Sequence, residues 1–332
     1  MEPKMKKSLL ALVLPSLFAS TVGAVEVYKD DGQSVDIYGR AYVGHNFGSE
    51  DSDEYGNDSY IRIGAKLKSD ISESLSAFGR YEVQYDLKDS EKDPTTKTRL
   101  AYVGLDSEVG AFSFGRQYGA VSLVSDITDI AYTNAYGGNT GVGSDHQGTG
   151  RDNSLLKYSN KFGGLQLDAT YRFEEAQNEQ DEIDGKQNAA YGLATTYELD
   201  FGLTLAAGFN ASSPTDDYDA SIFLVGASYK KGPVNVAATY AQGSEFEAKG
   251  KDHTAYELAV EYKITKQLRA QVLYNFQEIE ETVSSTKTDS VDDLVFGVRY
   301  DFNKSLRTVA EYRINGVDGK DDDFHLAARY SF

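Results

Sequence analysis

Charged side chains recur at every second position in several long stretches of this sequence. In SLSAFGRYEVQYDL, residues 74–87, one face carries Ser76, Phe78, Arg80, Glu82, Gln84 and Asp86. The opposite face carries Leu75, Ala77, Gly79, Tyr81, Val83, Tyr85 and Leu87. Such alternation is typical of a strand with one apolar and one wet face. Guanidinium and carboxylate groups in a row along the wet face are suited to attracting and passing ions.

Signatures of catalysis and of metal binding are missing from the sequence. It contains no Gly-x-Ser-x-Gly elbow, no Walker loop and no Gly-x-Gly-x-x-Gly motif. The four histidines show no metal-ligand spacing with one another. Asp51–Gly56 resembles the start of a calcium loop, but Tyr55 and Arg62 stand at two ligand positions. We therefore expect no enzyme activity, no metal site and no cofactor.

The elements that carry these charges are long strands joined by connections of two kinds. The alternation recurs in SVDIYGRAYVGHNF (34–47), SYIRIGAKLK (59–68), GLQLDATYRF (164–173) and DFHLAARYSF (323–332). Short connections lie at 69–74, 106–111, 161–164, 199–202, 230–233, 263–267 and 302–305. Longer acidic connections lie at 46–58, 88–97, 117–153, 173–188, 212–218, 242–253, 277–290 and 315–322. Together they join about sixteen strands, each antiparallel to its neighbours.

A membrane explains both the length and the charge of these strands. A soluble sandwich rarely uses strands of about fourteen residues, against a usual five or six. In lipid, a sheet must close on itself so that no backbone group lacks a partner, and a tilted strand crosses in about 9–11 residues. The sequence therefore predicts an all-β fold, a 16-stranded antiparallel transmembrane β-barrel. The apolar face meets lipid, and the charged face lines a water-filled lumen.

The first 24 residues differ from the rest of the chain. Lys4, Lys6 and Lys7 precede an apolar run over 9–18, and small residues follow at 22–24. This pattern predicts a secretory signal peptide over 1–24 that is removed, which leaves 25–332 as a single barrel domain. The formal net charge of -19 argues against nucleic acid as a partner, because phosphate binding needs a basic surface. The chain has no cysteine, so no disulfide supports the fold.

Four stretches in order, VEVYKDDGQSVDIYGRA, TKTRLAYVGL, FGRQYG and the final RYSF, give the chain a family likeness. From residue 25 to residue 332 it resembles a general porin of the Gram-negative outer membrane. The resemblance implies a homotrimer, integral in the outer membrane among lipid and lipopolysaccharide, with a pore in each subunit. It also implies a third loop folded inward to narrow that pore, a role that suits the connection over 117–153. Tyr330 and Phe332 resemble the terminal signal that the barrel-assembly machinery selects during biogenesis.

The resemblance also places a basic ladder on the wall, opposite acids on the third loop. The matching motifs give wall residues Arg40, Tyr60, Arg62, Lys97 and Arg99, with Arg151 as a further member. On the loop, the motif Thr-Asp gives Asp129. The family's second acid belongs to a Pro-Glu-Phe-Gly motif, which here reads Asn134–Gly137, so this acid is missing and Asp126 is a possible stand-in.

Passive diffusion of ions and small hydrophilic solutes is the leading functional hypothesis. The acidic mouth should enrich cations and the wall ladder should oppose this, so we expect a weak cation preference. One alternative is a substrate-selective channel, which for sugars would need an aromatic track. Tyr38, Tyr42, Tyr60 and Phe78 face inward but mix with Arg and Glu. The other alternative is a surface adhesin or receptor whose barrel only presents acidic loops.

Overall fold

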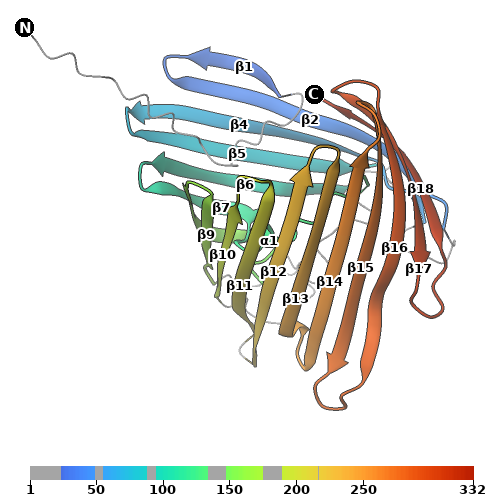
Figure 1. Ribbon diagram of the computed structural model, residues 1–332. Coiled ribbons are helices and arrows are strands. Elements are labelled where there is room, and N and C mark those ends of the chain that lie inside the picture. Colours follow the sequence, from blue (N-terminus) through green and yellow to red (C-terminus); the bar gives the residue numbers. More distant parts are fainter. Residues whose placement is uncertain (1–23, 49–54, 88–94, 134–146, 175–188, 216) are drawn as a thin grey trace, which may run out of the picture.

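The computed structural model describes residues 24–48, 55–87, 95–133, 147–174, 189–215 and 217–332. Its long strands curl into one closed barrel (Figure 1). The sixteen wall strands are β2 (Gln33–Asn46), β4 (Tyr60–Ser72), β5 (Leu75–Asp86), β6 (Thr95–Ser107), β7 (Gly110–Tyr118), β8 (Arg151–Phe162), β9 (Leu165–Arg172), β10 (Ala190–Glu198), β11 (Leu203–Thr215), β12 (Tyr218–Lys231), β13 (Val234–Ala248), β14 (Lys251–Lys263), β15 (Leu268–Glu281), β16 (Lys287–Asp301), β17 (Leu306–Asn315) and β18 (Asp323–Ser331). All pair antiparallel, so the predicted 16-stranded barrel is confirmed.

The barrel closes where the two ends of the described chain meet on β2. β18 pairs with the second half of β2, up to Ser331 opposite Arg40. The short strand β1 (Val25–Asp30) pairs with the first half, with Val25 opposite Ile37. Between them, the N–H of Gly39 donates to the carbonyl of Phe332 at 2.8 Å, and the N–H of Phe332 donates back at 3.0 Å. β1 and β18 together thus cover one edge of β2, which would otherwise be open to pairing.

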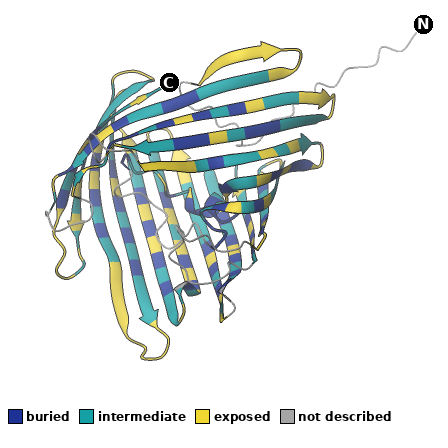
Figure 2. Ribbon diagram, turned by 180° about the vertical axis from the view of Figure 1, so that it is seen from behind, coloured by how far each residue is buried: buried dark blue, intermediate teal, exposed yellow. Residues whose placement is uncertain are grey.

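Buried and exposed residues alternate along the wall strands, as Figure 2 shows. On β6, Val103 and Leu105 are exposed outward, whereas Tyr102 turns to the lumen and contacts the Phe78 ring edge-on. A bulge between Glu82 and Val83 shifts the register of β5 against β6. The alternation predicted from sequence therefore holds along most strands, with local shifts at bulges.

The seven predicted short connections are short turns in the structure, but three of the predicted long loops are not loops. β11 and β12, β13 and β14, and β15 and β16 continue as paired strands through most of 212–218, 242–253 and 277–290. Contacts within each hairpin favour the extended conformation. Between β15 and β16, opposite charges pair across the strands, with Lys287 2.6 Å from Glu278 and 3.6 Å from Glu280. A two-residue strand, β3 (Gly56–Asn57), lies in the predicted loop over 46–58.

The connection between β7 and β8, residues 119–150, is called loop 3 below. It contains the only helix in the described part of the chain, α1 (Ser122–Ser125), which lies inside the barrel against β10, β11 and β12 (Figure 1). No described helix is both long enough and apolar enough to span a membrane. Loop 3 therefore adds an inner layer to one side of the barrel wall.

Candidate pore constriction

Loop 3 rests on an apolar patch of the inner wall. Ala120, Val121 and Val124, from the start of the loop and α1, are fully buried. They belong to one cluster with wall residues of β10 to β14, namely Ala194, Ala206, Ile222, Leu224, Ala241, Phe246 and Ala255. Inward positions of a pore wall would ordinarily be polar, because they meet water. These inward positions are apolar because loop 3, and not water, covers them.

Hydrogen bonds close the base of loop 3 and fasten it to the wall. The N–H of Gly119 donates to the carbonyl of Gly150 at 2.9 Å, so the two ends of the loop meet. Asp152, at the start of β8, accepts from the N–H of Gly148 at 2.8 Å and from Arg172 at 3.1 Å. Both side chains of this ion pair are almost fully buried. The end of loop 3 is thus held by the buried carboxylate of Asp152, and Arg172 balances its charge.

Two buried glutamates hold the middle of the loop. Glu257 on β14 accepts a hydrogen bond from the hydroxyl of Thr128. Glu311 on β17 accepts from the N–H of Tyr132 at 3.0 Å and from the hydroxyl of Thr133. Hydrogen bonds to a carboxylate are stronger than neutral ones, about 1.5–3 kcal/mol each. Sequence reasoning missed both glutamates, and only their inward parity on the strands distinguishes them.

The two predicted loop acids, Asp126 and Asp129, lie after α1 and are exposed toward the lumen. Reduced solvation inside the barrel raises the pKa of Asp126 to about 7, and repulsion by Asp129 and Asp168 adds to it, while Lys157 opposes it. Reduced solvation and Glu257 also raise the pKa of Asp129, against the attraction of Arg40. Because both side chains are exposed, lumen water solvates the charged forms and works against these rises.

The structure brings three of the predicted ladder residues together. Arg40 on β2 stands directly opposite Arg62 on β4. Arg62 and Arg99 both contact the Glu82 carboxylate, at 3.7 and 2.9 Å. Arg80 contacts the same carboxylate at 3.3 Å, and the sequence argument did not assign it to the ladder. One buried acid therefore organises three guanidinium groups at this part of the wall.

The other predicted wall residues occupy different surroundings. Tyr60 is 3% exposed and stacks on Tyr42 with ring centroids 4.9 Å apart, and the Arg62 guanidinium lies over its ring, 5.2 Å from the centroid. Lys97 stands away from Glu82, with its amine 2.8 Å from Asp86 and its side chain largely exposed. Arg151 lies at the end of loop 3, with its guanidinium 6.0 Å from the ring centroid of Tyr118.

Four further inward arginines extend the basic wall and were missed from sequence. They are Arg269 on β15, Arg299 on β16, Arg307 on β17 and Arg329 on β18. Arg269 stands opposite Arg299, and Arg307 stands opposite Arg329. Their parity would have predicted that they face inward, but only the register shows that they are neighbours of Arg40. The basic wall thus runs continuously from β15 through β18 and β2 to β6.

The remaining sequence predictions concern the missing loop acid, the two ends of the chain and metal binding. The stretch Asn134–Gly137 lies outside the described residues, as do residues 1–23 of the expected signal peptide. Phe332 forms the two backbone hydrogen bonds with Gly39 that close the barrel, and Tyr330 is exposed on the outer face. Within the described ranges, no group of three or more His, Cys, Asp or Glu side chains is arranged to hold a metal ion.

The chain is similar to known proteins both in sequence and in fold. A family model described as Gram-negative porin matches residues 8–320. An outer membrane porin protein OmpD of Citrobacter koseri is 31% identical over 98% of this chain and 96% of its own length. The solved structure of Salmonella typhi OmpF in complex with daunomycin superposes with a TM-score of 0.84, at 26% identity, over 93% of this chain and all of that one. The trimer form of OmpT from Vibrio cholerae, at 23% identity over 91% of this chain and all of its own, shares the fold with a TM-score of 0.71.

Proposed function

The chain belongs to the Gram-negative porin family, and we propose that it is a general diffusion porin through which ions and small hydrophilic solutes pass passively. It is an integral outer-membrane β-barrel. The observation that carries the proposal is the arrangement inside this barrel. Asp126 and Asp129 on loop 3 are exposed to the lumen, and Arg40 on the wall attracts Asp129. Charges on both sides of a narrowed lumen act on any ion that passes between them.

We infer a weak preference for cations. Without residues 1–24, which hold three lysines and one glutamate, the net charge changes from -19 to about -21, much of it in the long connections. The wall arginines oppose this locally, since screening confines each charge to about 8 Å at physiological salt. The pore therefore combines an acidic mouth with a basic wall, and the two effects partly offset each other.

Single-channel recording in a planar bilayer tests the proposal. A general pore gives a large, ohmic conductance that no single sugar saturates, whereas saturation by one sugar would indicate a selective channel. Absence of any conductance from folded protein would favour the adhesin or receptor alternative. The structure gives no support for a sugar track, because Tyr38, Tyr42, Tyr60 and Phe78 are all at most 8% exposed.

We propose that the pore assembles as a homotrimer through the outer face of β2, β4, β5 and β6. Exposed outward aromatics, which suit a membrane interface, occur on nearly all the other strands: Phe112, Phe114, Tyr171, Tyr191, Tyr197, Phe209, Phe223, Tyr229, Tyr240, Tyr256, Tyr262, Phe296, Tyr300, Tyr312 and Tyr330. On these four strands Tyr81 is the one exposed aromatic among the described residues, and the other exposed hydrophobic residues are aliphatic. A partner subunit that replaces lipid there would remove the need for the aromatic girdle.

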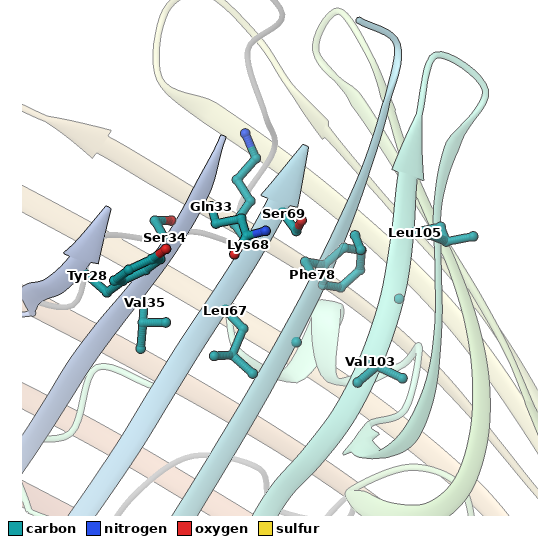
Figure 3. Close-up of a pocket in the computed structure, with 13 residues that line it drawn as sticks. Tyr28, Gln33, Ser34, Val35, Leu67, Lys68, Ser69, Phe78, Val103 and Leu105 are labelled. Atoms are coloured by element: carbon teal, nitrogen blue, oxygen red, sulfur yellow. The ribbon is translucent and has the colours of Figure 1, made fainter. Parts of the chain in front are cut away.

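The same face contains an apolar hollow of about 520 Å³, shown in Figure 3. Leu67 and Val103 flank it, and Gly79 lies between their strands without a side chain. Since the chain has no cysteine, Val103→Cys gives a single reporter thiol. In the trimer we expect the thiol of Val103→Cys to be shielded from a membrane-permeant maleimide and that of Phe223→Cys, on the lipid face of β12, to react. Equal labelling of both variants would contradict this choice of face.

We propose that residues 1–24 direct export and that Phe332 completes assembly. Deleting Phe332 removes the two hydrogen bonds with Gly39 as well as the terminal aromatic residue. We expect less detergent-resistant trimer and continued export of monomer. Phe332→Ala keeps the backbone hydrogen bonds, so it separates recognition of the side chain from closure of the barrel. A normal trimer yield after the deletion would overturn the assembly role.

A further inference from the structure

Four arginines form an uninterrupted row across the inner wall where the barrel closes. Arg307 on β17 stands opposite Arg329 on β18, and Arg40 on β2 stands opposite Arg62 on β4. The two pairs adjoin, because Arg329 is opposite Tyr42 and Arg40 is opposite Ser331. Residues on such a diagonal lie about 7–8 Å apart at their Cα atoms, within reach of long side chains. Arg307, Arg329, Arg40 and Arg62 are called the arginine row below.

The arginine row has too few carboxylates to match its charge. Arg62 has Glu82 at 3.7 Å, and Arg307 has Asp301 at 3.8 Å. Asp301 also contacts Arg299 at 2.9 Å and Arg269 at 3.7 Å, so one acid serves three guanidinium groups. In the middle of the row, Arg40 and Arg329 have no carboxylate within 4.0 Å among the residues that the structure describes. Arg329 is repelled by both Arg307 and Arg40.

Repulsion among the arginines destabilises the inner wall when no ligand is bound, and a bound anion would reduce this repulsion. Like charges directly opposite each other on paired strands destabilise a sheet. The effect is stronger here than in bulk water, because the inner wall is partly desolvated. Arg40, Arg307 and Arg329 are inward residues that are only partly buried, so lumen water reaches them, whereas Arg62 at the end of the row is 7% exposed. An anion from solution could therefore approach three guanidinium groups at once.

We propose that Arg40, Arg307 and Arg329 bind a tetrahedral dianion with the chemistry of sulfate, phosphate or a phosphate monoester. Each guanidinium presents a planar fork of donors that matches two oxygens of such a group. Chloride has neither the oxygens nor the second charge, so it is held less strongly. The site extends the predicted ladder by Arg307 and Arg329 and depends on the proposed pore only for access from solution.

An acid on loop 3 competes with a bound anion for Arg40. Asp129 on loop 3 attracts Arg40. This attraction competes with a bound anion at Arg40, so Arg307 and Arg329 contribute most of the added affinity. A dianion held there would in turn lie near the path of permeating ions. It should therefore lower the chloride current through the open pore without closing it.

The test measures sulfate binding and its effect on current with the full-length trimer. Isothermal titration calorimetry with sodium sulfate at pH 8 reports binding independently of conduction. We compare wild type with Arg307→Gln/Arg329→Gln, with Arg329→Lys, and with Arg313→Gln as a matched control. Arg313 is also an inward arginine of β17, but it pairs with Asp323 near the other end of the strand. Heat-modifiable migration in gels confirms that each variant is folded.

We expect saturable sulfate binding by wild type and by Arg313→Gln, and an affinity lower by about tenfold or more in the double variant. Arg329→Lys keeps the charge but loses the fork, so it should bind less tightly than wild type. Sulfate should reduce the chloride current of wild type and not that of the double variant. Equal binding by all variants, or binding by none, would overturn the site. A folded protein that binds sulfate but does not conduct would instead refute the pore proposal and leave the site standing.

Discussion

The inner wall of the barrel has two halves with different chemistry. From β10 to β14 its inward residues are largely small or apolar, such as Ala206, Ile222 and Leu224, and loop 3 covers them. From β15 through β18 and β2 to β6 the inward residues include carboxylates such as Glu82, Asp301 and Glu311, and nine arginines: Arg40, Arg62, Arg80, Arg99, Arg269, Arg299, Arg307, Arg313 and Arg329. Alternation along a strand thus tells which residues face inward, but not whether they meet water or protein.

The difference between the two halves of the inner wall explains how loop 3 can be held in place while charged groups stay exposed to the lumen. Desolvated apolar contacts fix α1 on one half, and carboxylate hydrogen bonds from Glu257 and Glu311 fix the rest of the loop. The loop acids Asp126 and Asp129 are then left exposed, with Arg40 of the other half attracting Asp129. The position of loop 3 and the proposed ion preference therefore involve different residues, and each can be changed separately.

The largest effect should come from placing a charge in the apolar half. Leu224 is 1% exposed beneath loop 3. In Leu224→Asp, docking of the loop would bury an unpaired carboxylate, at a cost of about 3–5 kcal/mol. That exceeds any one of the loop's hydrogen bonds, and the charge also replaces the apolar contact with Val121 and Val124, so we expect α1 to leave the wall and the constriction to widen. Single-channel conductance should rise, and proteases should cut loop 3.

Ser228→Asp is the matched control for this prediction. Ser228 is an inward residue on the same strand, lies outside the apolar cluster and is less buried. It should accept the same charge with little change in conductance or protease resistance. If Leu224→Asp keeps the conductance of wild type, the apolar patch is not what holds loop 3.

Most of the fold was predictable from sequence because it follows from alternation. Ser74–Leu87 predicted an inward face with Arg80 and Glu82, and β5 has that arrangement. The three extended hairpins were not predictable, since acidic, glycine-rich segments such as 242–253 have the composition of loops. There Phe246 enters the apolar cluster, and the N–H of Glu245 donates to Asp252 at 2.9 Å. These contacts within the hairpin decide its conformation, and composition does not report them.

The candidate site was only partly predictable. Motifs gave Arg40, Arg62 and Arg99, which lie close together near Glu82. They did not give Arg307 or Arg329, because only the register of β17, β18 and β2 makes these neighbours of Arg40. Nor did they give Glu311, whose role depends on where loop 3 folds. Roles that depend on contacts between distant segments need the structure.

The second prediction concerns the basic half. A unit charge about 8 Å from a passing ion contributes about 0.5 kcal/mol in water, which changes the local concentration of each ion roughly twofold and the cation-to-anion ratio roughly fourfold. Changing Arg40, Arg62 and Arg99 together to Gln should therefore raise the cation-to-anion permeability ratio several-fold. Reversal potentials under a salt gradient measure this ratio. The increase should shrink toward 1 M salt, where the Debye length falls to about 3 Å.

Arg116→Gln is the control for this triple variant. Arg116 is half-buried, donates to the carbonyl of Thr98 at 2.8 Å and, in the described part of the chain, makes no ion pair with Glu82. It should leave the reversal potential near that of wild type. An unchanged reversal potential in the triple variant at low salt would mean that these arginines do not line the constriction.

A smaller and opposite effect is expected from Asp129→Asn. This change removes one negative charge that attracts Arg40, so the cation-to-anion permeability ratio should fall by up to about fourfold at low salt. Asp70→Asn, on the exposed end of β4, removes the same charge away from loop 3 and should have little effect. Equal shifts for the two variants would show that total charge, and not position at the constriction, sets the preference.

The smallest effect should come from pH, through Asp126. Its raised pKa means that a falling pH protonates Asp126 before ordinary carboxyls, while Asp129, Asp168 and Lys157 are its charged neighbours. The cation-to-anion permeability ratio should therefore decline as the pH drops from 8 to 6, by less than in Asp129→Asn. The docked loop then binds a proton more readily than the undocked chain, so its docking should become slightly more favourable over the same range. Asp126→Asn should start with the lower ratio at pH 8 and lose the decline. If the decline persists in Asp126→Asn, another group is titrating, and the loop acids do not set the pH response of the pore.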